Sequence, residues 1–420
     1  MTDIIASDHF CGGGGTSTGL VRAIAKKRKT VSLLAINHWD VALETHKANY
    51  PWATHRDYNL DYAEPRKCVP GKYLDLLVTS PECTYHSNAL GGKPVKDQSR
   101  MTAQSTIRWA SEIHIEDILV ENVPEFMDWG PLNENMRPIR QEKGRFFLEY
   151  LAALRGLGYR VDHRILCAAD YGAPTTRERL FIQARKTEKI TWPEPTHTKD
   201  GDYGKLFGTS ERWVPAREII DWTIKGESIF DRKRPLKDTT LDRIKKGLKK
   251  FSLNPFLAVY HGTTGPGTER VQSIDAPLPT VDTSNRYGLC QPFVVALNHG
   301  KDESRSYSLD NPFPTVTSVD AWGLCEPFIV KYYSTGTVQG IDEPLGTVTT
   351  KDRFGLCVPV PEGHVIVDVL FRMLQPKELA AAMSFPREYI WRGTRGETVK
   401  QIGNAVPPLL AESIISTMIM

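Results

Sequence analysis

The first half of the chain alternates between strand-like and helix-like stretches, and this alternation limits the folds open to it. A glycine turn running into a helix is predicted at 12–27, and a second helix at 103–114. Buried strands are predicted at 3–10, 30–37, 73–80, 115–122, 159–168 and 179–184. Such alternation favours an α/β fold with a doubly wound parallel sheet and helices on both faces. The same α/β pattern returns after residue 365, where two prolines open a final helix.

Between these two parts the chain repeats itself. Three copies of a β-rich pattern end in Gly-Leu-Cys, with the cysteines at Cys290, Cys325 and Cys357. A period of about 35 residues, with turn residues between short strands, indicates stacked hairpins. The matching place of the three cysteines indicates apolar packing and not chemistry. We therefore predict a first domain at 1–195, an inserted smaller domain of repeats at 196–364, and a segment at 365–420 that completes the first domain.

Composition restricts the class of protein. Hydrophobic residues make up 40% of the chain and charged residues 25%, as in ordinary globular proteins. No apolar run approaches the roughly 20 residues of a membrane span, and no basic region precedes the short apolar stretch at the N-terminus. Seven scattered cysteines without a Cys-x-x-Cys pair indicate neither a disulfide framework nor a zinc site. We expect a cytoplasmic protein with no membrane contact and no metal.

One stretch is strongly basic although the net charge of the chain is only +3. Residues 231–250 carry nine lysines and arginines against three aspartates, with apolar residues at helical spacing. This pattern describes an amphipathic helix whose outer face is either simply solvated or follows a phosphate backbone.

A run of glycines separates the first predicted strand from the first helix. Gly12, Gly14 and Gly15 would let a ligand approach the backbone closely, and the helix N-terminus favours a negative group. The turn fits a nicotinamide, flavin or nucleoside site, and such glycines can also be purely structural. His38 and Trp39 follow the second strand, where an acid commonly holds a ribose. Trp39 could stack on an adenine ring or pack in the core.

Cys83 and Glu121 follow the ends of two predicted strands. In a parallel sheet these ends meet at the carboxyl edge, where ligands bind. Arg177 and Arg179 stand ahead of another strand. A thiolate can add to C6 of cytosine, while an acid at N3 and an arginine at O2 balance the charge that develops. C5 can then take a methyl group from a sulfonium donor. The alternative for Cys83 is a buried structural thiol.

Five motifs in order resemble those of the cytosine-5 DNA methyltransferases. "FCGGGG" at 10–15 matches the cofactor loop of that family, and "SPEC" at 80–83 stands where the family has its Pro-Pro-Cys nucleophile. "ENV" at 121–123 matches outright. "YGAPTTRERLF" at 171–181 parallels the arginine motif, and "QIGNAVPP" at 401–408 parallels the closing motif. The match covers most of the α/β part.

The resemblance implies roles for four catalytic residues. Cys83 would be the nucleophile, and Glu121 would contact N3 and N4 of the cytosine. Arg179 would hold O2, while Arg177 would support either the Cys83 loop or the transition state. Asn122 would order the nucleophile loop.

The resemblance also implies a Rossmann-like methyltransferase domain that binds S-adenosylmethionine. Phe10, Gly12, Gly14 and Gly15 would form the cofactor loop, and Trp39 would lie against the adenine. The remaining contacts would come from Asp57 at the adenine amine, which is otherwise an ordinary loop residue, and from Asn404 and Val406 at the methionine end.

The implied partner is double-stranded DNA, bound by a monomer of bacterial or phage type. Family members flip the target base out of the duplex, because C6 cannot be reached inside the stack. The inserted repeats would be the target-recognition domain, although they could instead be an assembly surface. An RNA cytosine-5 methyltransferase, a DNA-binding regulator without catalysis and a nicotinamide oxidoreductase are the competing functions.

Four positions depart from the family pattern. Glu82 replaces the second proline beside the nucleophile, and a carboxylate there raises a thiol pKa unless an arginine offsets it. Thr84 and Thr175 replace two glutamines. His38 replaces the ribose-holding glutamate, which weakens the expected ribose contact and leaves room for a modified sulfonium donor.

Overall fold

The computed structural model separates the chain into two compact units. It describes residues 4–81, 102–134, 137–199, 210–224, 226–230, 232–238, 240, 241, 244, 256–259, 271–278, 280, 281, 287–295, 306, 307, 328–331, 338–340, 354–357 and 368–419. Unit 1 comprises Met1–Ile220, Asp275–Asn285 and Gln375–Met420, and unit 2 comprises Asp221–Ile274 and Arg286–Leu374. The domain boundaries predicted from the sequence, after residue 195 and before residue 365, stay a prediction.

Unit 1 is built on a seven-stranded sheet in the order β3-β2-β1-β4-β5-β7-β6. The strands are β1 (Ile4–His9), β2 (Val31–Asn37), β3 (Thr54–Asp57), β4 (Tyr73–Thr79), β5 (His114–Asn122), β6 (Arg160–Cys167) and β7 (Glu178–Arg185). The first five strands pair in parallel, which confirms the predicted α/β class.

The predicted parallel pairing holds for the first five strands and does not extend to β7. This strand runs antiparallel to both of its neighbours, β5 and β6. Residues 168–177 join β6 to β7, and they are too few for the crossover of a dozen or more residues that a parallel neighbour needs. The start of β7 therefore lies at the same edge of the sheet as the end of β5.

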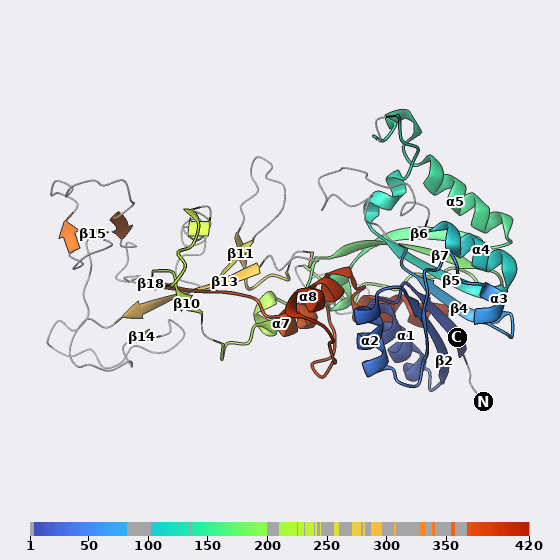
Figure 1. The fold of residues 1–420 in the computed structure, drawn as a ribbon, viewed down its shortest axis with the longest axis horizontal. Helices are drawn as coiled ribbons and strands as arrows, with labels where there is room; N and C mark the ends of the chain where they lie inside the picture. The colour runs from blue at the N-terminus through green and yellow to red at the C-terminus, as the bar shows by residue number, and fades with distance from the viewer. Residues whose placement is uncertain are drawn as a thin grey trace. The chain divides into compact units, whose positions relative to one another are not determined.

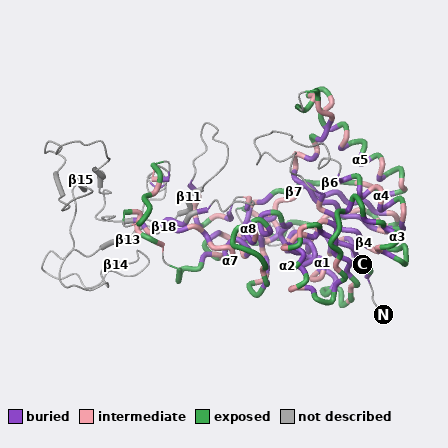
Figure 2. The backbone as a smooth tube through the Cα atoms, viewed as in Figure 1, coloured by how far each residue is buried: buried purple, intermediate pink, exposed green. Residues whose placement is uncertain are grey.

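Helices cover both faces of this sheet. The described helices of unit 1 are α1 (Gly15–Lys26), α2 (Asp40–Asn49), α3 (Pro65–Cys68), α4 (Gln104–Glu112), α5 (Arg145–Gly156), α7 (Pro376–Ala382), α8 (Arg395–Asn404) and α9 (Pro408–Met418). Figure 1 shows α4 and α5 on one side of the strands and α1 and α2 on the other. Buried side chains concentrate along the strands and the helix faces that meet them (Figure 2). Pro408 opens α9 as predicted, because proline loses no hydrogen bond at a first helical position.

Unit 2 contains two three-stranded arrangements of the same kind. In the first repeat copy, β11 (Phe256–Val259) lies between β12 (Val271–Ser273) and β13 (Tyr287–Val295). In the third copy, β15 (Phe328–Lys331) lies between β16 (Val338–Gly340) and β17 (Phe354–Cys357). The registers also agree, since Phe256 pairs with Cys290 and Phe328 with Cys357. The hairpin prediction for these copies is confirmed.

The remaining described strands are β18 and four short ones. Unit 2 also has β10 (Glu227–Ser228), β14 (Ser306–Tyr307) and β18 (Asp368–Met373), and unit 1 has β8 (His197–Thr198) and β9 (Glu211–Arg212). Cys290 is fully buried and packs near Val369 and Phe371, as its apolar role predicts. Cys325 and half of the basic stretch at 231–250 lie outside the described residues.

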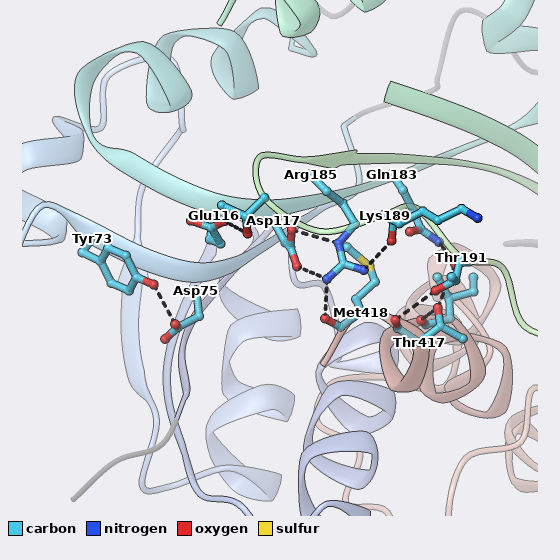
Figure 3. A network of polar contacts seen from close by, with 12 residues as sticks. Tyr73, Asp75, Glu116, Asp117, Gln183, Arg185, Lys189, Thr191, Thr417 and Met418 are labelled. Carbon is cyan, nitrogen blue, oxygen red and sulfur yellow. Dashed lines mark hydrogen bonds and ion pairs between the residues drawn. The ribbon is translucent and has the colours of Figure 1, made fainter. Parts of the chain in front are cut away.

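A buried ion pair ties the last helix of unit 1 to the sheet (Figure 3). Arg185, at the end of β7, donates from Nε and Nη2 to the two oxygens of Asp117 on β5, at 3.0 and 2.7 Å. Its Nη2 also donates to the Met418 carbonyl at 2.7 Å, and its Nη1 to the Lys189 carbonyl at 3.2 Å. One guanidinium thus joins two strands, a connecting segment and the end of α9.

None of the helices in the described residues has both the length and the apolar character of a membrane span. Within the same part of the chain, no group of three His, Cys, Asp or Glu side chains is placed to hold a metal ion.

Candidate active site

The predicted functional residues gather where the strands of unit 1 end. His9 ends β1 opposite Thr79 of β4, and Asn37 ends β2 opposite Asp57 of β3. Glu121 is the penultimate residue of β5. Because neighbouring parallel strands share a carboxyl edge, this edge is the expected ligand-binding side of the sheet.

Glu121 and Arg179 form an ion pair at this edge. Arg179 Nε lies 3.2 Å from Glu121 Oε1, and the two side chains are only 12% and 11% exposed. Glu121 pairs with Phe181 in the ladder, so Arg179 is its diagonal neighbour two residues away on the antiparallel strand. The reversed direction of β7 makes the pair possible, since a parallel strand would begin at the opposite edge.

Arg177 lies on the same face of the chain as Arg179 but binds elsewhere. Its side chain is 2% exposed, and Nη1 donates to the Val281 carbonyl at 2.5 Å. Its own carbonyl accepts from the Ala168 amide at 2.9 Å. The predicted support of the Cys83 loop by Arg177 stays a prediction.

The nucleophile itself lies outside the described residues, together with Glu82 and Thr84. The segment that leads to it is held at the edge of the sheet. Asn122 Nδ2 donates to the Pro81 carbonyl at 3.3 Å, while its Oδ1 accepts from the Val123 amide at 2.9 Å. The contact to Pro81 agrees with the ordering role predicted for Asn122.

The glycine turn has one open side and one closed side. Gly12 has a φ of +53°, and within the part of the chain that the structure describes, a Cβ added there would meet only the Phe10 carbonyl, at 3.9 Å. A Cβ added at Gly14, where φ is +95°, would lie 2.5 Å from Tyr389 Oη. At Gly15 it would collide with the Val406 carbonyl. Gly12 therefore leaves room for a ligand, while Gly14 and Gly15 let the C-terminal segment pack against the turn.

Trp39 is half-buried at the start of α2. Its amide donates to Asn37 Oδ1 at 2.8 Å, which fixes the turn out of β2. Lys400 of α8 places Nζ 4.5 Å from the centre of the indole ring, a cation–π contact. Trp39 is therefore partly exposed and not fully enclosed by core residues.

Asp57 is exposed at the end of β3. A hydrogen bond with the Asp40 carboxyl raises the pKa of Asp57 above its usual value. Two neighbouring carboxylates repel each other when both are ionised, and a ligand amine that donates hydrogen bonds to them would reduce this repulsion. Asn404 is exposed at the end of α8, whereas Val406 is buried.

A buried polar chain beneath the glycine turn escaped the sequence analysis. Ser17 Oγ donates to Asp8 Oδ2 at 2.6 Å and lies 2.9 Å from His46 Nε2. His46 Nδ1 lies 2.8 Å from His55 Nε2. The only sequence signal was an aspartate within the apolar first strand.

Burial shifts the pKa values of Asp8 and His46 in opposite directions. It raises the pKa of Asp8 to about 7 and lowers the pKa of His46 to about 3. Folded protein keeps a proton on Asp8 at pH values where unfolded protein has lost it. Stability from Asp8 is therefore fully present below its unfolded pKa and is lost as the pH rises to about 7.

Asp8→Asn is expected to remove this loss. As the pH rises from the ordinary aspartate pKa of 3.8 to about 7, the free energy of unfolding of the variant should rise relative to that of wild type by on the order of 1.4 kcal/mol per pH unit. Urea unfolding of both proteins at pH 4.5 and 7.5 measures the difference. A stability difference that is equal at the two pH values would contradict the assignment.

Comparisons with known proteins agree with this geometry. A profile of the family described as C-5 cytosine-specific DNA methylase matches residues 5–420. The type II methyltransferase M.AgeI of Thalassovita gelatinovora is 26% identical over 51% of this chain and 49% of its own length. M.NgoMIV of Neisseria gonorrhoeae is 30% identical over 52% of this chain and 64% of its own length. The chain spans about half the length of the first curated relatives it matches.

Solved structures support the fold. A putative DNA modification methyltransferase from an Escherichia coli prophage aligns with a TM-score of 0.51 at 16% identity, covering 99% of this chain and 98% of the other. The Dnmt2 methyltransferase of S. pombe aligns with a TM-score of 0.52 at 13% identity, covering 99% and 98%. At such identities the likeness concerns the fold alone. The profile match over nearly the whole sequence shows that the chain belongs to the C-5 cytosine-specific DNA methylase family.

Proposed function

We propose that the protein transfers a methyl group from S-adenosylmethionine to C5 of cytosine in double-stranded DNA. The observation that carries this proposal is the Glu121–Arg179 pair at the carboxyl edge. Asn122, beside Glu121, holds the Pro81 carbonyl two residues before Cys83. A carboxyl group, a guanidinium group and a thiol would thus meet at one place, as attack on a cytosine ring requires.

The described residues fit the cofactor. Among the described residues, the space beside Gly12 is open, and the partly exposed Trp39 lies just beyond the end of the neighbouring strand β2. Asp57 and Asp40 together favour a hydrogen-bond donor such as an adenine amine. Phe10, Gly14, Gly15, Asn404 and Val406 complete the set that we assign to binding. Bound S-adenosylmethionine would supply an electrophilic methyl group on sulfur.

Each residue of the catalytic set has a separate task in this reaction. The thiolate of Cys83 adds to C6 of the flipped cytosine and forms a C–S bond. Glu121 stabilises the charge that develops at N3, and Arg179 holds O2. C5 becomes nucleophilic and accepts the methyl group, while the electron pair of the broken methyl–sulfur bond would stay on the sulfur of the cofactor and leave a neutral thioether. Loss of the C5 proton then breaks the C–S bond and frees Cys83.

Replacing Glu121 with glutamine is expected to lower the rate of methyl transfer by about 10²- to 10³-fold. Glutamine has nearly the same shape but cannot exchange a proton with N3. Glu116→Gln is the matched control, because Glu116 lies near the opposite end of the same strand. Steady-state rates on one DNA substrate measure both. If both variants lost the same fraction of the methyl-transfer rate, Glu121 would have no catalytic role.

The substrate is tested by competition between duplex DNA and tRNA for label from methyl-labelled S-adenosylmethionine. We expect label on C5 of cytosine in DNA, at a rate unaffected by excess tRNA. Labelling of tRNA in preference to DNA would favour an RNA methyltransferase of the same fold. Failure of wild-type protein to label either nucleic acid would favour a regulator without catalysis or a modified sulfonium donor.

A further inference from the structure

One segment of the repeat region packs inside unit 1. Residues 275–281, which we call the strap, lie in the connection from β12 to β13 of the first repeat copy. Both strands belong to unit 2, yet Asp275–Asn285 cluster with unit 1. The strap runs alongside residues 174–177, which lead directly into β7.

Hydrogen bonds fasten the strap to this stretch. The Leu278 amide donates to the Pro174 carbonyl at 2.9 Å, and the Leu278 carbonyl accepts from the Thr176 amide at 2.6 Å. Three residues on, the Val281 carbonyl accepts from Arg177 Nη1 at 2.5 Å. The pattern resembles a short added strand, with Thr175 and Leu278 forming a parallel bridge.

A second anchor holds the beginning of the strap. The Ala276 carbonyl accepts from the Ala216 amide at 2.8 Å, and Arg217 Nε lies 2.6 Å from Asp275 Oδ1. That ion pair is exposed, so it contributes little by itself. The apolar contact is stronger, because the Leu278 side chain is fully buried and Val281 is 1% exposed.

The strap thus fixes the residues immediately before the proposed catalytic pair. Arg177 and Arg179 are two positions apart, so they share one face of the extended chain. Arg177 is held by Val281, and Arg179 by Glu121. A loose 174–177 stretch would let the start of β7 fray away from β5.

We propose that Leu278 is a positioning residue, which anchors the strap and thereby aligns Arg179 with Glu121 for the reaction. This inference rests on the proposed methyl transfer. It also gives the repeat region a role within the catalytic unit besides contact with DNA.

The chain contains its own comparison residue. The strap sequence "DAPLPTV" recurs as "DNPFPTV" at 310–316 and "DEPLGTV" at 342–348. Leu345 therefore occupies in the third copy the place that Leu278 occupies in the first. Among the described residues, Leu278 and Val281 supply the contacts to 174–177, and the inference assigns this role to the first copy, so the two leucines should respond differently to substitution.

Hydrogen exchange of full-length protein tests the structural part. In Leu278→Ala, the Thr176 amide and its neighbours up to 182 should exchange at least about 10-fold faster, because the bond to the strap is loosened. Leu345→Ala should leave exchange at 174–182 at the wild-type rate. Unchanged exchange in Leu278→Ala, or an equal rise in Leu345→Ala, overturns the inference whether or not the wild-type protein methylates DNA.

Kinetics test the consequence for the reaction. Leu278→Ala should lower kcat about 10- to 100-fold while KM for DNA and Kd for S-adenosylmethionine stay within twofold. Leu278→Met, which keeps the volume, should restore most of kcat. If Leu278→Ala does not fold, Leu278→Val provides the same measurement with a smaller change. Faster exchange with unchanged kcat would show that the strap does not position the pair.

Discussion

Replacing Cys83 with alanine is expected to lower the rate of methyl transfer by at least about 10⁴-fold, close to the rate without enzyme. Without a nucleophile at C6, C5 of cytosine stays a poor acceptor of the methyl group. Binding of S-adenosylmethionine should persist, because the residues assigned to it lie in other parts of unit 1. Transfer of labelled methyl groups and calorimetric titration of the cofactor measure the two properties separately.

The other described thiols are poor alternatives. Burial raises the pKa of Cys11 well above its usual range, and burial also raises the pKa values of Cys68 and Cys167. A raised thiol pKa leaves little thiolate near neutral pH. Cys68→Ala is the matched control, since this half-buried residue ends α3 away from the carboxyl edge. Retained activity in Cys83→Ala would refute the proposed mechanism.

Replacing Arg185 with methionine is expected to destabilise the protein by roughly 3 to 5 kcal/mol. The change leaves the Asp117 carboxylate buried without its guanidinium, and the carbonyls of Lys189 and Met418 lose a donor. The pair is 3% and 9% exposed, so water cannot replace these bonds readily. Chemical denaturation measures the loss, which should appear in unit 1.

Two further variants separate this effect from a general one. Adding Asp117→Leu to Arg185→Met should recover most of the stability, because the uncompensated charge is then gone. Arg145→Met, at an exposed ion pair with Glu142 and Glu149, should shift the denaturation midpoint only slightly. A loss in Arg185→Met no larger than that in Arg145→Met would contradict the role given to the buried pair.

The sequence predicted much of unit 1 because strand and helix periodicity is local information. The ends of β1, β4 and β5 could be placed at one edge from the parallel rule, and Glu121 with them. The direction of β7 could not be predicted in this way, because a strand shows the same alternation of buried and exposed residues whichever way it runs. The antiparallel course of β7 is what brings Arg179 to Glu121.

Other parts of the site depend on contacts between distant residues. Asp8, Ser17 and His46 come from three elements, and only the packed fold shows that their polar atoms are linked. Likewise, the repeat pattern predicted hairpins but gave no reason for Leu278 to pack on residues 174–177. The packing of the Val406 carbonyl against Gly15 also joins distant parts of the chain, and no local sequence pattern indicates it.

The most direct test of the central claim is to trap the covalent bond. Wild-type protein and S-adenosylmethionine would be incubated with duplex DNA of varied sequence in which 5-fluorocytosine replaces cytosine. Fluorine at C5 cannot leave as the proton does, so a C–S bond between Cys83 and C6 should persist. We predict a denaturation-resistant complex of one protein per site, with the linked peptide containing Cys83. No such complex, or a link to another residue, in protein that methylates ordinary DNA would contradict the account.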